Sequence, residues 1–222
     1  MNWRHVAAGF SLLAGAAMLG GCVTASVDEL VFTGVSEQLG DASVVVLGRR
    51  HASDYETEPE FVACVGKHIS RGANGITVVS EQDFVDALYP WFEPRTAPMH
   101  PADINRLLEV EPLRQALSRM KTAYIVWVDG KTTRSDSMGS MACGIGVGGA
   151  GCFGFGTWDD VSEYEAVIWD FTRQREVGRI GAAASGQSYM PALVVPIPII
   201  APVKGTACDG IGEQLLQFFS TK

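Results

Sequence analysis

Residues 123–128 read Ala-Tyr-Ile-Val-Trp-Val, the strongest β-strand pattern in the chain. β-Branched and aromatic side chains dominate this run, and such side chains favour strands. A helical pattern leads into it, because Leu113, Leu117 and Met120 share one face of a helix over 111–120. The sequence therefore predicts a helix that runs directly into a strand.

The same alternation of elements extends towards the N-terminus. Residues 43–48 read Ser-Val-Val-Val-Leu-Gly, a continuous apolar run that predicts a buried strand. Thr57 can cap a helix that ends at Gly72, and it has Glu60 at the capping-box position. A short strand at 76–79 then leads into a helix that opens at Ser80. A loop with several prolines and a helix at 103–108 follow.

Towards the C-terminus, a polar stretch at 131–137 precedes a glycine-rich segment at 141–158. We expect that segment to be a flexible surface loop. Two apolar runs, 165–171 and 176–182, are joined by polar residues and predict a hairpin. Four prolines in 191–203 exclude a central strand there, and a last amphipathic helix is expected to begin near Asp209.

This order of strands and helices predicts an α/β fold (an α+β sandwich), with a mixed β-sheet flanked by helices in a single domain. We place that domain at residues 43–222. Residues 22–42 are expected to form a tether, with a weak helix at 27–39.

The first 21 residues have the profile of a signal peptide. One fixed charge, Arg4, is followed by an uncharged apolar stretch that is too short and too rich in glycine for a stable transmembrane helix. The segment closes with Leu19-Gly20-Gly21-Cys22, which resembles the lipobox of bacterial lipoproteins. The alternative is a buried N-terminal helix that contains a cysteine by chance.

The lipobox resemblance implies cleavage before Cys22 and attachment of lipid (diacylglycerol and palmitate) to its thiol. Several acyl chains hold a protein far more firmly than one chain does. Val23 and Thr24 follow, with no Asp in the position of the usual inner-membrane retention signal. The resemblance therefore implies an outer-membrane protein, anchored by lipid on the periplasmic face.

Five cysteines are present, and assigning Cys22 to lipid leaves four. In an oxidising compartment, four cysteines allow three disulfide patterns. Cys143 and Cys152 flank a short glycine-rich segment and are natural partners, which leaves Cys64 for Cys208. The alternative is four buried free thiols.

The chain has 222 residues and a formal net charge of −8. A single domain of this size can bury a substantial core. Its acidity gives it no electrostatic reason to bind nucleic acid or anionic lipid.

Motifs with defined chemistry are few. Residues 144–149 match G-x-G-x-x-G but lack the strand-to-helix context of a nucleotide site. Cys64 and His68 have metal-ligand spacing, but two ligands do not make a site. We therefore expect no metal and no cofactor. His51 and Asp54 follow the end of a strand and could serve a hydrolase, but an ordinary polar loop is the favoured interpretation, because any loop there would be polar.

The element order also resembles the periplasmic domain of the curli-secretion lipoproteins and the N-terminal domain of the Tol-system propeller protein. The matching features are the strand 44–47, the helix 59–70, the strand 124–128, the hairpin 167–180 and the closing helix. The resemblance implies a fold and transfers little function. Curli-type channels add long membrane-crossing hairpins, for which residues 141–158 are barely long enough.

These observations predict a non-catalytic envelope lipoprotein that binds envelope proteins or further copies of itself. Its working surface would be the aromatic cluster Tyr89, Trp91 and Phe92 and the proline-rich run 196–200, if these are exposed. The alternatives are a lipid-anchored hydrolase built on His51 and Asp54, and a pore-forming oligomer that uses the hairpin 141–158.

Overall fold

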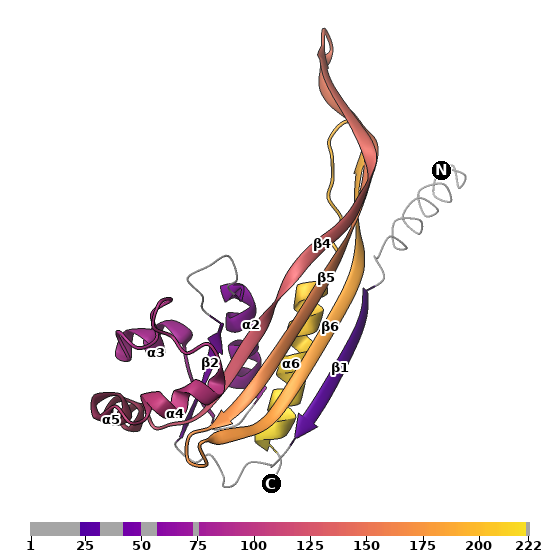
Figure 1. The fold of residues 1–222 in the computed structure, drawn as a ribbon. Coiled ribbons are helices and arrows are strands. Elements are labelled where there is room, and N and C mark those ends of the chain that lie inside the picture. The colour runs from indigo at the N-terminus through magenta and orange to yellow at the C-terminus, as the bar shows by residue number, and fades with distance from the viewer. Residues whose placement is uncertain (1–22, 32–41, 50–56, 73–75, 221–222) are drawn as a thin grey trace, which may run out of the picture.

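The computed structural model describes residues 23–31, 42–49, 57–72 and 76–220 (Figure 1). The expected signal peptide and Cys22 lie outside these ranges, as do His51 and Asp54.

A single six-stranded sheet organises the described chain, in the order β1-β6-β5-β4-β2-β3. β2 pairs in parallel with β3 and with β4, whereas β4, β5, β6 and β1 pair antiparallel. The sheet is therefore mixed, as predicted. The strands are β1 (Val23–Val31), β2 (Ser43–Gly48), β3 (Thr77–Val79), β4 (Thr122–Gly146), β5 (Gly149–Asp170) and β6 (Arg175–Ala192).

Helices cover both faces of this sheet (Figure 1). α2 (Pro59–Gly72) and α6 (Val203–Ser220) pack on one face. The other face carries α3 (Glu81–Ala87), α4 (Ile104–Leu107) and α5 (Glu111–Met120), with the 3₁₀ turn η2 (Pro101–Asp103) before α4. The predicted α/β class, with a mixed sheet flanked by helices in one domain, is confirmed.

The alternation of side chains along the central strands explains the two helical layers. In β2, Val44 and Val46 belong to the core beneath α2 and α6, whereas Val45 and Leu47 belong to the core beneath α3 to α5. Successive side chains of a strand point to opposite faces, so a strand buried on both faces must be apolar throughout. The uninterrupted apolar runs in β2 and at the start of β4 are the consequence.

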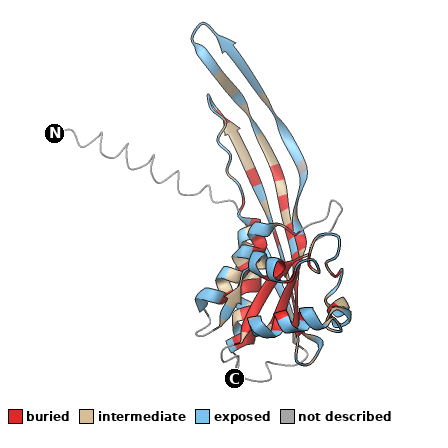
Figure 2. Cartoon of the chain, turned by 90° about the vertical axis from the view of Figure 1, so that its left-hand side faces the viewer, coloured by how far each residue is buried: buried red, intermediate tan, exposed pale blue. Residues whose placement is uncertain are grey.

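Strands β4 and β5 continue far beyond this body. β4 has 25 residues and β5 has 22, several times the usual strand length. They leave the sheet as a long two-stranded projection (Figure 1). Buried residues gather in the body, and the projection is mostly exposed (Figure 2).

The prediction that the glycine-rich segment 141–158 is a flexible loop is therefore wrong. It forms paired β-structure in which Gly146 faces Gly149 across a two-residue turn at Val147 and Gly148. Glycine weakens a strand pattern because it offers no side chain to pack, which hid this hairpin in the sequence.

Residues 23–31 also differ from the expected tether with a weak helix. They form β1, which pairs with β6 from Val23↔Gly186 to Val31↔Gly178. The described sheet thus includes residues 23–31, which precede the expected start of the domain at residue 43. Pairing with β6 outweighs the weak helical preference of the isolated segment, because secondary-structure propensity is small compared with tertiary contacts.

The packing of β1 on α6 can be tested at Gly210. A Cβ at that position would lie 2.6 Å from Cγ2 of Val27. Gly→Ala in a helix normally stabilises by up to about 1 kcal/mol. We expect Gly210→Ala to destabilise instead, by about 1 to 3 kcal/mol, because Val27 must move. Urea unfolding measures the difference.

Gly205→Ala is the matched control in the same helix, because a Cβ there meets nothing within 4 Å. It should leave the free energy of unfolding unchanged or raise it. If Gly210→Ala stabilised as much as Gly205→Ala, β1 would not pack on α6.

Candidate functional site

The projection and a neighbouring segment form one uncharged end of the molecule. Residues 137–157, in the hairpin of β4 and β5, contain no Asp, Glu, Lys, Arg or His. Residues 193–200, which follow β6, contain none either. We call these two segments together the apolar arm. A charge-free surface of this length is unusual in a chain that has 17 basic and 25 acidic residues.

Apolar side chains of the arm face solvent. Ile145 is 91% exposed, Phe153 is 72% exposed and Leu193 is 78% exposed. Among the described residues, ten of the thirteen exposed large hydrophobic side chains lie in the arm: Met138, Ile145, Val147, Phe153, Phe155, Leu193, Val194, Val195, Ile197 and Ile200. Apolar surface gathered in this way marks a contact with a membrane or with another protein.

A backbone hydrogen bond joins the two segments of the arm, and two more join the second segment to β6. The amide of Cys152 donates to the carbonyl of Val194 at 2.8 Å. Tyr189 and Ile199 exchange two further bonds, at 2.8 and 2.7 Å. The proline-rich segment therefore lies against the hairpin rather than hanging free, and the two apolar surfaces are continuous.

A polar network closes the base of the arm. We call Arg134, Trp158, Asp160 and Ser188 the collar. The Asp160 carboxylate is buried, and it accepts bonds from Trp158 Nε1 at 2.8 Å, Ser188 Oγ at 2.8 Å and Arg134 Nε at 3.1 Å. The Arg134 guanidinium also lies over the Trp158 ring, 4.7 Å from its centroid. The collar thus links β4, β5 and β6 through their side chains at the level where the arm begins.

Asp160→Asn tests the collar. Oδ2 accepts from Trp158 Nε1 and Ser188 Oγ, and Oδ1 accepts from Arg134 Nε. An amide has a single oxygen, so its NH2 donor must face either Arg134 or the two buried donors. We expect a loss of about 1 to 3 kcal/mol in the free energy of unfolding. Asp159→Asn is the control, because its side chain points to the opposite face of the strand. Equal effects of the two variants in urea unfolding would contradict the collar.

The register of the sheet relates the arm to Cys22. Val23 pairs with Gly186, Gly186 pairs with Asp160, and Asp160 pairs with Arg134. These pairs cross four neighbouring strands at one level. Val23 is the residue that follows Cys22 in the sequence. The predicted lipid-bearing residue is thus attached at the level of the collar, where the arm begins.

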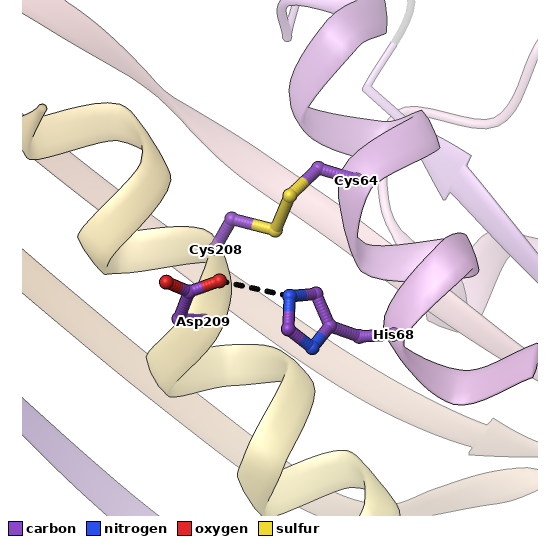
Figure 3. The surroundings of a disulfide bond; sticks show 4 residues. All are labelled: Cys64, His68, Cys208 and Asp209. Atoms are coloured by element: carbon purple, nitrogen blue, oxygen red, sulfur yellow. Dashed lines mark hydrogen bonds and ion pairs between the residues drawn. A yellow bond between two sulfur atoms is a disulfide. The ribbon is translucent and has the colours of Figure 1, made fainter. Parts of the chain in front are cut away.

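Both of the expected disulfide pairs are present. Cys64 of α2 joins Cys208 of α6 with a Cα–Cα distance of 6.3 Å (Figure 3). Cys143 and Cys152 face each other across the hairpin of the arm, with a Cα–Cα distance of 4.0 Å. The first bond ties together the two helices of one layer, and the second clips the arm.

The spacing of Cys64 and His68 brings these residues to the helix interface, not to a metal site. Their ligand atoms and that of Cys208 lie within 4.8 Å of one another. Both sulfurs are in the disulfide and offer no thiolate to a metal ion. His68 Nε2 lies 2.8 Å from Asp209 Oδ1, so the imidazole contacts the neighbouring helix (Figure 3).

The two disulfides should differ in their effect on stability. The Cys64–Cys208 bond links residues 144 positions apart, so Cys64→Ala with Cys208→Ala should cost about 3 to 5 kcal/mol in urea unfolding. Cys143→Ala with Cys152→Ala should cost little, because the unclipped tip of the arm can fray in the folded state too.

Limited proteolysis separates the two cases further. The second double variant should be cut faster within the arm while its body stays intact. An equal loss of global stability in both double variants would contradict this division between body and arm.

The proposed hydrolase residues His51 and Asp54 lie outside the described residues, but some neighbours of their loop are described. The Gly48 amide donates to Glu81 Oε1 at 2.9 Å, and Arg49 pairs with Asp129 at 2.8 Å. Tyr164 donates to Glu58 at 2.7 Å, and burial is the main reason why the pKa of its hydroxyl lies above the ordinary range. These contacts link the end of β2 and the start of α2 to α3, β4 and β5.

The two predicted docking patches differ in exposure, and the glycine motif lacks the structural context of a nucleotide site. Phe92 is buried, Trp91 is half-buried and Tyr89 is exposed, so the aromatic cluster belongs largely to the core. The proline-rich run is exposed at Ile197 and Ile200. The G-x-G-x-x-G pattern lies at the tip of the arm, where a strand and not a helix follows it.

Comparisons with known proteins assign no family. No family model matches the chain, and no curated protein matches it. Among solved structures, it is similar to the PelC dodecamer from Paraburkholderia phytofirmans, at 10% identity and a TM-score of 0.40, over 90% of this chain and 100% of the other. A substituted form of that dodecamer matches at 11% identity and a TM-score of 0.38, with the same coverage.

Within the described residues, no helix has both the length and the apolar character needed to cross a membrane.

Proposed function

We propose that the protein is an exported lipoprotein, acylated on Cys22 and held at the periplasmic face of the outer membrane. It works by binding other envelope proteins or further copies of itself, and it catalyses no reaction. The lipobox-like sequence 19–22 supports the anchor, and its context of a charged start and an apolar stretch supports export.

One structural observation carries the proposal: the exposed apolar surface lies at the end of the molecule where Cys22 is attached. Ten exposed hydrophobic side chains of the arm gather there, and Val23 lies level with the base of that arm. The charged body lies on the other side of the collar. A protein with an apolar end and a charged body is suited to a membrane surface, where an apolar phase meets water.

The short connection between Cys22 and β1 supports a fixed orientation. β1 begins at residue 23, so no described tether separates the lipid-bearing residue from the sheet. Acyl chains on Cys22 would therefore hold the body close to the membrane, with its arm end towards the lipid.

The edges of the sheet offer surfaces for partners. β1 and β3 each pair with one neighbour only in the described sheet, β1 along nine residues and β3 along three. An edge strand presents unpaired backbone donors and acceptors that another chain can bind. We therefore expect self-assembly, or binding of another envelope protein, to use β1.

Membrane fractionation and intact mass of the native protein and a Cys22→Ala variant test the anchor. The native protein should carry the mass of its acyl chains and sediment with outer membranes, because several chains bind firmly. Cys22→Ala should be unmodified and remain soluble. The Cys143→Ala, Cys152→Ala double variant is the control and should remain acylated.

Chemical cross-linking of the membrane-bound protein then tests the binding role. Cross-links are expected between copies or to another envelope protein, with β1 peptides among the linked sites. An unmodified, soluble native protein would contradict the anchor, and a native protein without cross-links would contradict the binding role.

A further inference from the structure

We infer that the apolar arm itself enters the lipid of the membrane that holds Cys22, at the depth of the interface between headgroups and acyl chains. The inference rests on the proposed lipid anchor and deepens it, because it names the partner of the arm. The occupant is lipid rather than a second protein.

The first step is the position of the anchor. Val23 lies opposite Gly186, and a Cβ at Gly186 would meet Val23, Ala201 and Val203 at 2.8 to 3.1 Å. Val23 and the chain just after the arm segment 193–200 therefore both lie against Gly186, in one hydrophobic cluster. Lipid on the preceding residue would bring the bilayer surface to the base of the arm. The arm projects from that level away from the charged body (Figure 1).

The second step is the distribution of charge. Arg134, Asp159 and Asp160 lie at the base, and no charged side chain lies between 137 and 157. A charged side chain inside a bilayer costs several kcal/mol, and an uncharged one avoids this cost. The charged side chains end at the level where the anchor places the membrane surface. An arm that bound a protein in water would not need to lack charge beyond that level.

The third step is length. From Met138 to Gly146, β4 has nine residues in the arm. At roughly 3.4 Å per residue, these span about 30 Å. The arm is thus long enough to cross the headgroup layer and reach its interface with the acyl chains. Tyr189, half-buried at the base with its ring 6.2 Å from that of Phe155, occupies the level at which tyrosine and tryptophan gather in membrane proteins.

The fourth step distinguishes lipid contact from a water-filled channel. Strands that line a channel alternate polar and apolar side chains. One face of the hairpin carries Phe153 and Phe155, and the opposite face carries Met141 and Ile145. Apart from Ser137, Ser140 and Thr157 near the base, both faces are apolar or glycine, so neither suits a water-filled lumen.

The backbone sets the depth. Strand edges are not tolerated in the hydrocarbon without hydrogen-bond partners. Val194 supplies one partner to the outer edge of β5 at Cys152, and headgroups and their water can supply the others at the interface. The interface is therefore the depth at which both the apolar side chains and the open edges are satisfied.

Labelling with an apolar carbene-generating probe tests the inference. The native acylated protein is reconstituted in vesicles of phosphatidylethanolamine and phosphatidylcholine, which carry no net charge to repel this acidic chain. After photolysis, the label should concentrate in peptides that cover 137–157 and 193–200. Peptides of α5 should carry background label only.

A matched pair of variants sharpens the test. Ile145→Glu with Phe153→Glu places two charges on side chains that are 91% and 72% exposed, so the fold should be unaffected and the urea midpoint unchanged. Arm labelling should fall about tenfold, because acidic side chains resist transfer into lipid. Met99→Glu also charges an exposed apolar side chain, but it lies outside the arm and should leave the labelling unchanged.

The outcomes separate the two proposals. An unlabelled arm on an acylated protein would overturn the inference, and cross-links from arm to arm would then identify a second copy as the occupant. An intact mass without acyl chains would overturn the anchor instead. In that case, arm labelling by the same vesicles would still decide whether the arm binds lipid.

Discussion

The antiparallel pairing of β4 with β5 is the interaction on which the rest of the structure depends. It runs from Tyr124↔Asp170 in the buried body to Gly146↔Gly149 at the tip of the arm. The same two strands therefore contribute to both helical cores and carry the exposed end. The ladder has a register irregularity between Ser135 and Met138, next to the collar at Asp160, and this level marks the transition from core to arm.

Sequence patterns predicted the body well because burial on both faces leaves a strong signal. The apolar run in β2 and the helix 111–120 appear as expected. The arm was missed because eight glycines in 139–156 hide its strands. β1 was missed because its register with β6 depends on residues far away in the chain. The lack of charge over 137–157 was a visible signal for the arm, but only the structure shows that its apolar side chains face solvent.

The candidate site was predicted in part. The cysteine pairing followed from spacing, since Cys143 and Cys152 flank a turn and the other two then remain. Exposure could not be predicted, and it decides between the two patches: Phe92 is buried, whereas the proline-rich run is exposed. What links the arm to Cys22 is the register across β1, β6, β5 and β4, a relation between distant segments that no local pattern contains.

Hydrogen exchange tests the central claim most directly, by comparing the acylated protein on vesicles with soluble Cys22→Ala protein. The account predicts slower exchange on vesicles in 137–157 and 193–200, because lipid excludes water from these amides, with unchanged exchange in β2 and α6. Unchanged exchange in the arm, or slowing confined to the face that carries α3 to α5, would contradict it.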